Sequence, residues 1–349
     1  MELDHLDPAW DWDGGLVRDI CAVLAMPAAF RPRCRAHRGF FMTATLDRER
    51  DKMRTGALPG PVGFIGAGRV GTALSALLNA RGIVIAGVSG RTPRDARRMA
   101  SEAGLNPLVA RNRSETLRSS AIVFLTVPDD SIAVLCREIA DEGGWREGQG
   151  VVHCSGALSS DVLQPARDMG ALTASFHPLQ AFASLDAALA NLPGSTFALE
   201  GDEALVGQLD TFVRLLGGTA LHLQAEDKIL YHAAAAIASN YTVTLAALAA
   251  DLLVREGVAA DANKALHYLM PLLRGTIENL DNAGLPGALT GPIARGDAGT
   301  VARHLEALEK CSPEMAHLYR HLARLTLPLA IKKGGLDENV VRQLNELLD

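Results

Sequence analysis

The fold of this chain is set by residues 62–71, which read VGFIGAGRVG. A short apolar run ends here in the pattern Gly66-x-Gly68-x-x-Gly71, which is typical of a strand that turns tightly into a helix and binds a dinucleotide. Gly66 permits the turn, Gly68 lets the backbone approach a pyrophosphate, and Gly71 lets the helix pack close to the strand. The other members of the predicted cofactor-binding turn are Ala67, Arg69 and Val70.

The glycine pattern has the surroundings that a dinucleotide site needs. Residues 62–65 precede it as a strand, and Val70, Leu74 and Leu78 recur after it at helical spacing. A pyrophosphate would bind the free N–H groups and the positive dipole at the start of that helix. The alternative is an ordinary strand, turn and helix without a ligand, but the complete context favours a nucleotide site.

The predicted second strand, residues 83–88, indicates which nucleotide the site prefers. NAD-binding versions carry an Asp or Glu at its end, about 20 residues past the glycines, which accepts hydrogen bonds from the ribose 2′-OH. This chain has Ser89, Arg91 and Thr92 there and no acid. Hydroxyls and a guanidinium suit a 2′-phosphate, so the sequence predicts NADP(H), with Arg94 adding positive charge. In the alternative, Arg91 lies on a solvated surface.

Strand-like and helical segments alternate up to residue 224, and only helices follow. This order predicts right-handed crossovers and a mostly parallel, doubly wound α/β sheet, with later strands near its end running antiparallel. The expected strands are 62–66, 83–88, 107–110, 121–127, 151–154, 172–176, 196–199 and 219–223. The expected later helices are 226–255, 261–282, 298–310, 313–332 and 336–348. We therefore predict a Rossmann domain at 59–224 and an all-α domain at 225–349.

The composition narrows the class of protein. The 349 residues are 48% hydrophobic and 21% charged, which suffices for a large core and suits two domains. A formal net charge of −6 gives no reason to expect nucleic acid or an anionic membrane as a partner. The five cysteines are scattered without paired spacing, which favours a reducing, cytoplasmic compartment and indicates no metal site.

Residues 1–58 differ from the rest of the chain. They show no sustained periodicity, and their acidic start lacks the apolar core of a signal peptide. We expect a disordered extension that carries no chemistry, or a start codon assigned too far upstream, with Met42 or Met53 as later candidates.

Residues 232–254 form the most apolar long segment. The segment is rich in Ala and Leu and uncharged until Asp251, but its Ser, Asn, Tyr and Thr side chains would be costly in a lone membrane span. We therefore expect a buried helix of the helical domain, and no membrane partner.

Ligands of open α/β sheets bind outside the carboxyl ends of the strands, so residues that follow strands are candidate site residues. The strand at 121–127 ends with Val127, and Pro128 comes next. We expect both to touch the cofactor through backbone and apolar surface. Asp129 or Asp130 is expected to cap the helix that follows.

Two later strands end in further candidates. Ser155, beside Gly156, either hydrogen-bonds a substrate carbonyl or carboxylate or initiates the next helix. His177 stands before Pro178, where the chain leaves the sheet, and has either a structural or a catalytic role. Cys154 is not expected to act as a nucleophile, because no sequence feature marks a base for it.

The candidate acid–base groups open the first long helix, where residues 227–232 read DKILYH. Helical spacing places Lys228 and His232 on one face above small alanines, with Asn240 just beside it. A Lys whose pKa is lowered by burial can deliver the proton that carbonyl reduction needs. The alternative is an ordinary helix start with Lys228 in solvent.

The order of these features resembles the 6-phosphogluconate dehydrogenase-like superfamily, which includes 2-dehydropantoate 2-reductases and pyrroline-5-carboxylate reductases. Residues 62–333 more closely resemble a group of bacterial Rossmann-like NADP-dependent oxidoreductases whose C-terminal half is a domain of unknown function. The segments that carry this resemblance are TVPDD at 126–130, HCSG at 153–156, HPLQAF at 177–182, KxxYHAAA at 228–235 and ALTGPIARGD at 288–297.

The resemblance implies roles for individual residues and an oligomer. The superfamily's catalytic Lys corresponds to Lys228, and its usual Asn partner one turn later corresponds to His232, so Asn240 is a candidate for the missing amide. Relatives form an intertwined dimer through the helical domain, which implies a homodimer here. Arg295 then binds a substrate carboxylate, in its own or the partner's site, or lies on the surface. Asp297 is expected to cap the helix at 298–310.

These observations predict an NADPH-dependent oxidoreductase that reduces a small carboxylate-bearing carbonyl compound, a 2-oxo acid of the 2-dehydropantoate kind. Lys228 protonates the developing alkoxide, His232 and Asn240 orient the substrate, and Arg295 or Ser155 anchors the carboxylate. One alternative is an imine reductase of the pyrroline-5-carboxylate type. Another is a non-catalytic NADP(H)-binding protein that retains the fold.

Overall fold

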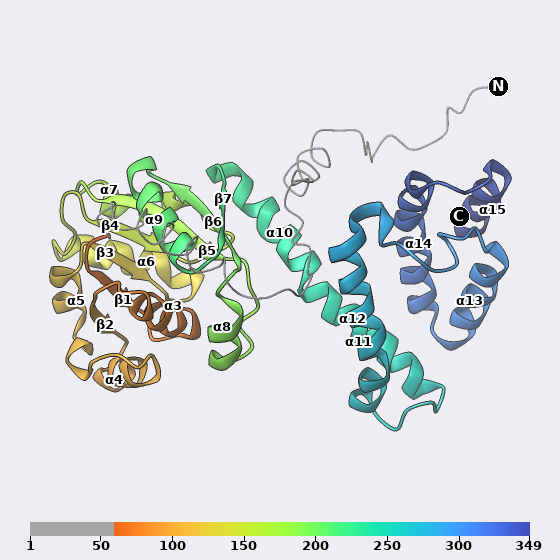
Figure 1. The fold of residues 1–349 in the computed structure, drawn as a ribbon, viewed down its shortest axis with the longest axis horizontal. Helices are drawn as coiled ribbons and strands as arrows, with labels where there is room; N and C mark the ends of the chain where they lie inside the picture. The colour runs from red at the N-terminus through yellow and green to blue at the C-terminus, as the bar shows by residue number, and fades with distance from the viewer. Residues whose placement is uncertain (1–58) are drawn as a thin grey trace, which may run out of the picture. The chain divides into compact units, whose positions relative to one another are not determined.

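A computed structural model describes residues 59–349 of the chain. The expectations for residues 1–58 lie outside the described residues. Figure 1 follows the described chain by colour, from the strands of a sheet to the helices that come after residue 225.

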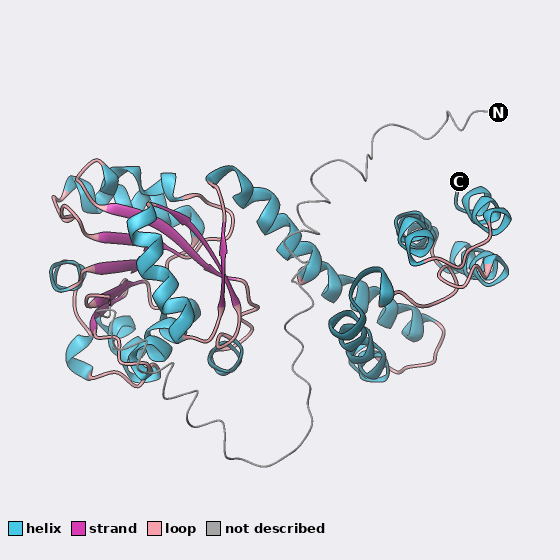
Figure 2. Ribbon diagram, turned by 45° about the horizontal axis from the view of Figure 1, so that its top comes forward, coloured by secondary structure: helices cyan, strands magenta, loops and turns pink. Residues whose placement is uncertain are grey.

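The first part of the described chain is a seven-stranded sheet with helices on its faces (Figure 2). Its strand order is β2-β1-β3-β4-β5-β6-β7. The strands are β1 (Val62–Ile65), β2 (Ile85–Ser89), β3 (Ile122–Leu125), β4 (Gly150–His153), β5 (Leu172–Pro178), β6 (Thr196–Gly201) and β7 (Thr219–His222). All neighbouring pairs are parallel except β5 and β6, so the prediction of antiparallel strands near the end of the sheet is confirmed.

One expected strand is wrong. Residues 107–110 were expected to be extended, but Pro107–Val109 form the short 3-10 helix η1, and Ala110 makes only an isolated bridge to Val88. The side chain of Asn106 accepts a hydrogen bond from the backbone N–H of Leu108, and Pro107 occupies the first turn. This local turn chemistry prevails over the short apolar run.

Helices connect the strands and cover the sheet. They are α3 (Arg69–Ala80), α4 (Pro93–Glu102), α5 (Arg113–Ser119), α6 (Asp129–Asp141), α7 (Gln164–Arg167), α8 (Leu185–Asn191) and α9 (Glu203–Leu215), with the 3-10 turns η2 (Ser160–Leu163) and η3 (Ala225–Asp227). β1, β3 and β4 are buried along their whole length, as expected for strands covered on both faces. The core on one face is centred on the ring of Phe124, whose centroid lies 5.1 Å from that of Phe64 and 5.6 Å from that of Phe176.

Only helices follow the sheet, which confirms the predicted fold class. They are α10 (Lys228–Ala238), α11 (Asn240–Arg255), α12 (Ala262–Gly287), α13 (Ala298–Cys311), α14 (Pro313–Lys333) and α15 (Glu338–Leu348). The single helix expected at 226–255 is divided at Ser239. Asp297 caps α13 as predicted, because its carboxylate accepts a hydrogen bond from the backbone N–H of Thr300 at 2.9 Å.

The apolar segment at 232–254 is exposed in the single chain, so the prediction of a buried helix is wrong. Within the described residues, 225–255 is the one helical stretch long and apolar enough to cross a membrane by length and composition, and 6% of its most apolar window is buried. α11 and α12 bury little more than the small side chains of Ala250, Ala259 and Ala265 between them. Several of their larger apolar side chains are exposed, among them Tyr241, Val243, Leu272 and Ile277.

Candidate functional site

The strand order reverses beside β1, because the chain passes from β1 to β2 on one side and then to β3 on the other. Open α/β sheets bind ligands in the crevice outside the strand ends at such a reversal. A cavity of about 1030 Å³ lies at this edge. Of the predicted cofactor-binding residues, its lining includes Gly66, Ala67, Gly68, Ser89, Arg91, Thr92, Val127 and Pro128.

The three glycines have the roles that their spacing predicts. Gly66 has a φ of +118°, and a Cβ on it would lie 2.5 Å from the carbonyl oxygen of Thr126. A Cβ on Gly71 would lie 2.3 Å from the Thr126 hydroxyl, so only glycine lets α3 pack this closely. At Gly68 the nearest atom to such a Cβ is 3.6 Å away, which leaves its backbone open toward the cavity.

The end of β2 fits the ribose of a dinucleotide. Ser89 is 1% exposed and lines the cavity, yet its hydroxyl has no hydrogen-bond partner within residues 59–349. A buried hydroxyl without a partner is unfavourable unless a ligand satisfies it. Thr92 was predicted to bind the cofactor, but its hydroxyl caps α4. It accepts a hydrogen bond from the N–H of Asp95 and donates one to the Asp95 carboxylate.

The same end of the cavity is rich in arginine. Arg98 donates to the carbonyl oxygen of Ala67 at 2.9 Å and pairs with Glu102, so it steadies the glycine turn. Arg91 and Arg111 also line the cavity, and neither makes an ion pair within the described chain. These unpaired guanidinium groups suit an anion such as a 2′-phosphate.

Sequence reasoning missed Thr126, Arg98 and Arg111. Thr126 closes β3 and donates from its hydroxyl to the carbonyl oxygen of Gly66 at 2.7 Å, which ties the β3 end to the glycine turn. The sequence did offer a signal for Thr126, because it stands one residue before Val127, at a strand end where ligands bind. Arg98 and Arg111 carried no such signal, because they reach the site only through the packing of α4 and of the segment after η1.

Asp129 does not cap α6, which corrects the sequence-based expectation. Pro128 is the N-cap residue and no side chain caps this helix. Instead, the Asp129 carboxylate accepts a hydrogen bond from the hydroxyl of Ser155 at 2.6 Å. The Ser155 oxygen also accepts from the backbone N–H groups of Ala157 and Leu158. The Ser155 hydroxyl thus initiates the turn after β4, and its one hydrogen is already donated.

Lys228 is buried at the sheet edge, with 1% of its surface exposed. Its Nζ donates to the carbonyl oxygen of Ser155 at 2.9 Å and to the hydroxyl of Ser175 on β5. The first residue of α10 is therefore tied to the turn after β4 and to the middle of β5. Burial lowers the pKa of the Lys228 ammonium from 10.5 to about 8, an effect opposed by the negative charge of Glu200.

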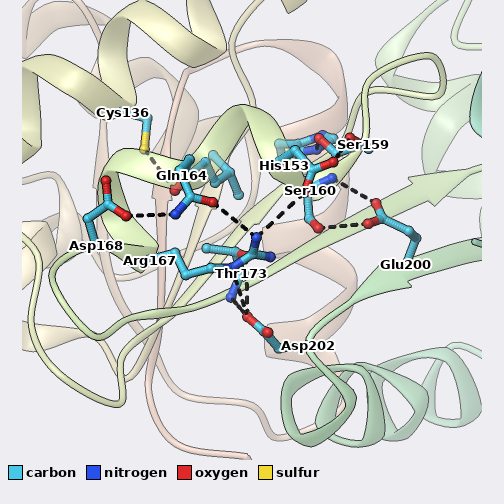
Figure 3. A network of polar contacts seen from close by, with 12 residues as sticks. Cys136, His153, Ser159, Ser160, Gln164, Arg167, Asp168, Thr173, Glu200 and Asp202 are labelled. Atoms are coloured by element: carbon cyan, nitrogen blue, oxygen red, sulfur yellow. Dashed lines mark hydrogen bonds and ion pairs between the residues drawn. The ribbon is translucent and has the colours of Figure 1, made fainter. Parts of the chain in front are cut away.

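Glu200 on β6 is a buried carboxylate held by the protein (Figure 3). Its two oxygens accept from the backbone N–H of Ser160 at 2.8 Å and from the Ser160 hydroxyl at 2.7 Å. These bonds fix a negative charge that favours the protonated form of Lys228. A second polar group surrounds Thr173 on the neighbouring strand β5. Arg167 of α7 donates to the Thr173 hydroxyl, and the carboxylate of Asp202, just after β6, accepts from both the N–H and the hydroxyl of Thr173.

His177 and His232 converge on Gly156. The ring centroids of the two histidines lie 5.9 Å apart in an edge-to-face arrangement. A Cβ on Gly156 would lie 2.8 Å from Nε2 of His177 and 2.5 Å from Nδ1 of His232. Gly156 therefore allows both imidazoles to approach the β4 end. The other ring nitrogen of His177, Nδ1, lies 2.8 Å from the hydroxyl of Tyr231 on α10.

Burial and the charge of Lys228 keep the neighbouring imidazoles neutral. The pKa of His177 is lowered to about 4 by burial, by Lys228 and by His232. The pKa of His153 is lowered to about 3 by burial and Lys228. His153 accepts from the N–H of Ser155 at Nδ1, so its hydrogen lies on Nε2, which faces the carbonyl oxygen of Ser159 at 3.1 Å. Burial raises the pKa of the Cys154 thiol to about 12, so it stays protonated, as expected for a residue without a nucleophilic role.

The structure brings together Lys228, His232, His177, Ser155 and Gly156. It places the remaining predicted residues elsewhere. Arg69 donates to the carbonyl oxygens of Phe182 and Ala183. Val70 packs on the sheet core. Asn240 opens α11 with an exposed side chain, and Arg295 is exposed in the turn before α13.

Comparison with known proteins supports the division into sheet and helices. A model described as a Rossmann-like domain matches residues 47–178, and a model described as domain of unknown function DUF2520 matches residues 195–326. No curated protein matches the sequence significantly.

Several solved structures are similar along nearly their whole length. One, described as a proposed NADP oxidoreductase from Bacteroides fragilis, is 25% identical over 77% of this chain and 98% of its own, with a TM-score of 0.59. A Thermotoga maritima protein is 26% identical over 78% of this chain and 99% of its own, with a TM-score of 0.61. An imine reductase from Pseudomonas sp., at 17% identity over 83% of this chain and 100% of its own, shares the fold with a TM-score of 0.51.

The glycine turn, the crevice at the strand reversal and both matching models agree with one another. The fold is Rossmann-like and is similar to that of a solved protein described as an NADP oxidoreductase. The chain carries a Rossmann-like domain followed by a DUF2520 domain.

Proposed function

We propose that the protein is an NADPH-dependent reductase of a small carboxylate-bearing carbonyl compound such as a 2-oxo acid. The observation that carries this proposal is the buried ammonium of Lys228 at the ligand-binding edge of the sheet. Bound NADPH would supply a hydride at this edge. The residues of the chain then have to hold the substrate and provide a proton to its oxygen.

Preference for NADP(H) is supported by the residues around the orphaned Ser89 hydroxyl. Residues 89–94, at the end of β2, contain no Asp or Glu, and Arg91 and Arg111 line the same cavity without an ion-pair partner among the described residues. A 2′-phosphate would accept hydrogen bonds from these groups, whereas an NAD ribose would leave the guanidinium charges unused. The similarity to the Bacteroides fragilis protein, at 25% identity, agrees with this choice.

Lys228 is suited to be the proton donor. An ammonium carries three hydrogens, and two of them are donated to Ser155 and Ser175. The third is left for a substrate oxygen. Since the pKa of Lys228 is about 8, the group is protonated at neutral pH yet more acidic than an ordinary Lys. His232, which converges with His177 on Gly156, would orient the substrate.

The charge at this site favours a carbonyl over an imine. A protonated imine is positive and has no lone pair on nitrogen, so the Lys228 ammonium would repel it. A carbonyl oxygen accepts the hydrogen bond and gains negative charge during reduction, which the ammonium stabilises. The site therefore fits a carbonyl better than the iminium that an imine reductase handles.

A homodimer through the helical domain is part of the proposal. Large apolar side chains of α10, α11 and α12 are exposed in the single chain, among them Ile229, Leu230, Ile237, Val243, Leu272 and Ile277. An apolar surface of this extent is typical of an interface, and a second copy presents the same surface.

The mass in solution tests the dimer. Light scattering is expected to give twice the 37.0 kDa mass of the chain. Ile237→Asp, which places a charge within the apolar surface, should shift the protein toward a single chain. The control Val84→Asp, at an exposed position before β2, should leave the mass unchanged. A wild-type mass of one chain would contradict the proposal.

Replacing Arg91 tests the preference for NADP(H). Arg91→Ala should weaken NADPH binding by about 10- to 100-fold, because one charge-assisted hydrogen bond is lost. NADH binding should stay within about threefold, since NADH lacks the phosphate. Arg94→Ala is the matched control, because Arg94 is exposed on α4 and does not line the cavity. An equal loss for NADPH and NADH would exclude the proposed role of Arg91.

The pH dependence of the reduction tests Lys228. Because the group must be protonated to act, kcat for a 2-oxo acid should be level well below the pKa of about 8, reach half its maximum at that pH and fall further above it. Lys228→Met should lower kcat by about 10²- to 10⁴-fold and leave NADPH binding in place. The exposed Lys310→Met is the control. Turnover that survives Lys228→Met would refute the role, and turnover of cyclic imines alone would refute the substrate class.

A further inference from the structure

The pair formed by Tyr231 and His177 is a second polar group at the site, beside Lys228. Tyr231 lies on α10 three residues after Lys228, and its hydroxyl is 2.8 Å from Nδ1 of His177 on β5. The two rings meet edge to face, with centroids 5.6 Å apart. The pair thus links the same helix to the same strand as Lys228 does, but through neutral groups.

The hydroxyl of Tyr231 is the donor in this pair. Burial raises the pKa of Tyr231, so the phenol keeps its hydrogen, and Nδ1 of His177 is the one hydrogen-bond partner that its oxygen has within residues 59–349. If Nδ1 carried a hydrogen instead, the phenol hydrogen would be left without an acceptor. Burial and the positive charge of Lys228 oppose the protonation of His177. A neutral imidazole that accepts at Nδ1 carries its single hydrogen on Nε2.

The Nε2 hydrogen of His177 is free to bind a ligand. Within the described chain Nε2 has no hydrogen-bond partner, and it lies over Gly156 next to Nδ1 of His232. His177 is only half-buried, so a ligand can reach it. Gly156 is part of the segment that also carries the carbonyl oxygen bound by Lys228. Nε2 of His177 and Nζ of Lys228 therefore both lie against residues 155–156, just after β4.

We propose that Tyr231 is a positioning residue that fixes His177 in the Nε2–H tautomer, so that His177 donates a hydrogen bond to the substrate's carboxylate while Lys228 serves the carbonyl oxygen. This inference rests on the proposed reduction of a carboxylate-bearing carbonyl compound. The state of His177 does not depend on that reaction, so it can be measured separately.

The chain contains a matched pair for comparison. Nδ1 of His304 lies 3.0 Å from the hydroxyl of Tyr319, and these rings also meet edge to face, with centroids 5.8 Å apart. This second pair joins α13 to α14, outside the proposed site. Tyr319→Phe therefore makes the same chemical change as Tyr231→Phe at a pair without a role in the proposed reaction.

The experiment measures the tautomer and the kinetics of the same variants. NMR of protein labelled with ¹³C and ¹⁵N in histidine, with NADP⁺ bound and His177 assigned through His177→Gln, should show the Nε2–H form in the wild type. Tyr231→Phe should give a mixture of both tautomers. For a 2-oxo acid its KM should rise about tenfold with kcat within about threefold, because substrate binding is lost rather than proton transfer. Tyr319→Phe should change neither KM nor the His177 signals.

Each outcome decides one of the two proposals. An Nδ1–H tautomer in the wild type, or an Nε2–H tautomer that persists unchanged in Tyr231→Phe, would overturn the role of Tyr231, whatever the substrate is. The wild-type measurement needs no variant to fold. The Nε2–H form together with no turnover of any 2-oxo acid would instead overturn the proposed substrate class and leave the positioning of His177 by Tyr231 established.

Discussion

The burial of a charged lysine at the start of α10 is the constraint on which the candidate site depends. Nζ of Lys228 donates to a carbonyl after β4 and to a hydroxyl in the middle of β5, so one side chain ties the first helix after the sheet to two neighbouring strands. An ammonium without such partners would be strongly destabilising inside the protein. Burial, together with the positive charge of Lys228, lowers the pKa values of His153 and His177 and keeps both neutral. The pKa of Lys228, about 8, lies near physiological pH.

The carboxylates around the site hold the donors in place and do not face a ligand themselves. Asp129 accepts from Ser155, and Glu200 accepts twice from Ser160. In the cavity beside the glycine turn, Ser89 and Arg91 lack protein partners among the described residues. This cavity and the Lys228 cluster therefore both offer hydrogen-bond donors, which suits a phosphate-bearing cofactor in the cavity and an oxygen-rich substrate at Lys228.

The sequence predicts what depends on local chemistry. Gly66 and Gly71 specify the turn because a Cβ on either would collide with Thr126. The sequence does not reveal what depends on neighbours distant along the chain. Asp129 meets Ser155 only because β3 and β4 are adjacent. Lys228 is buried by residues 53 and 73 positions earlier, so composition alone favoured a solvent-exposed Lys at an ordinary helix start. The apolar composition of α11 likewise does not reveal whether other parts of the same chain bury this helix.

A crystal structure with NADP⁺ and oxamate, a non-reactive analogue of a 2-oxo acid, tests the central claim most directly. The account predicts that the carbonyl oxygen of oxamate lies about 3 Å from Nζ of Lys228, at hydrogen-bond distance, while Nζ keeps its bond to Ser155. The same structure should place the 2′-phosphate against Arg91. Oxamate bound with its carbonyl oxygen out of reach of Lys228, and Nζ enclosed by protein atoms alone, would contradict the account.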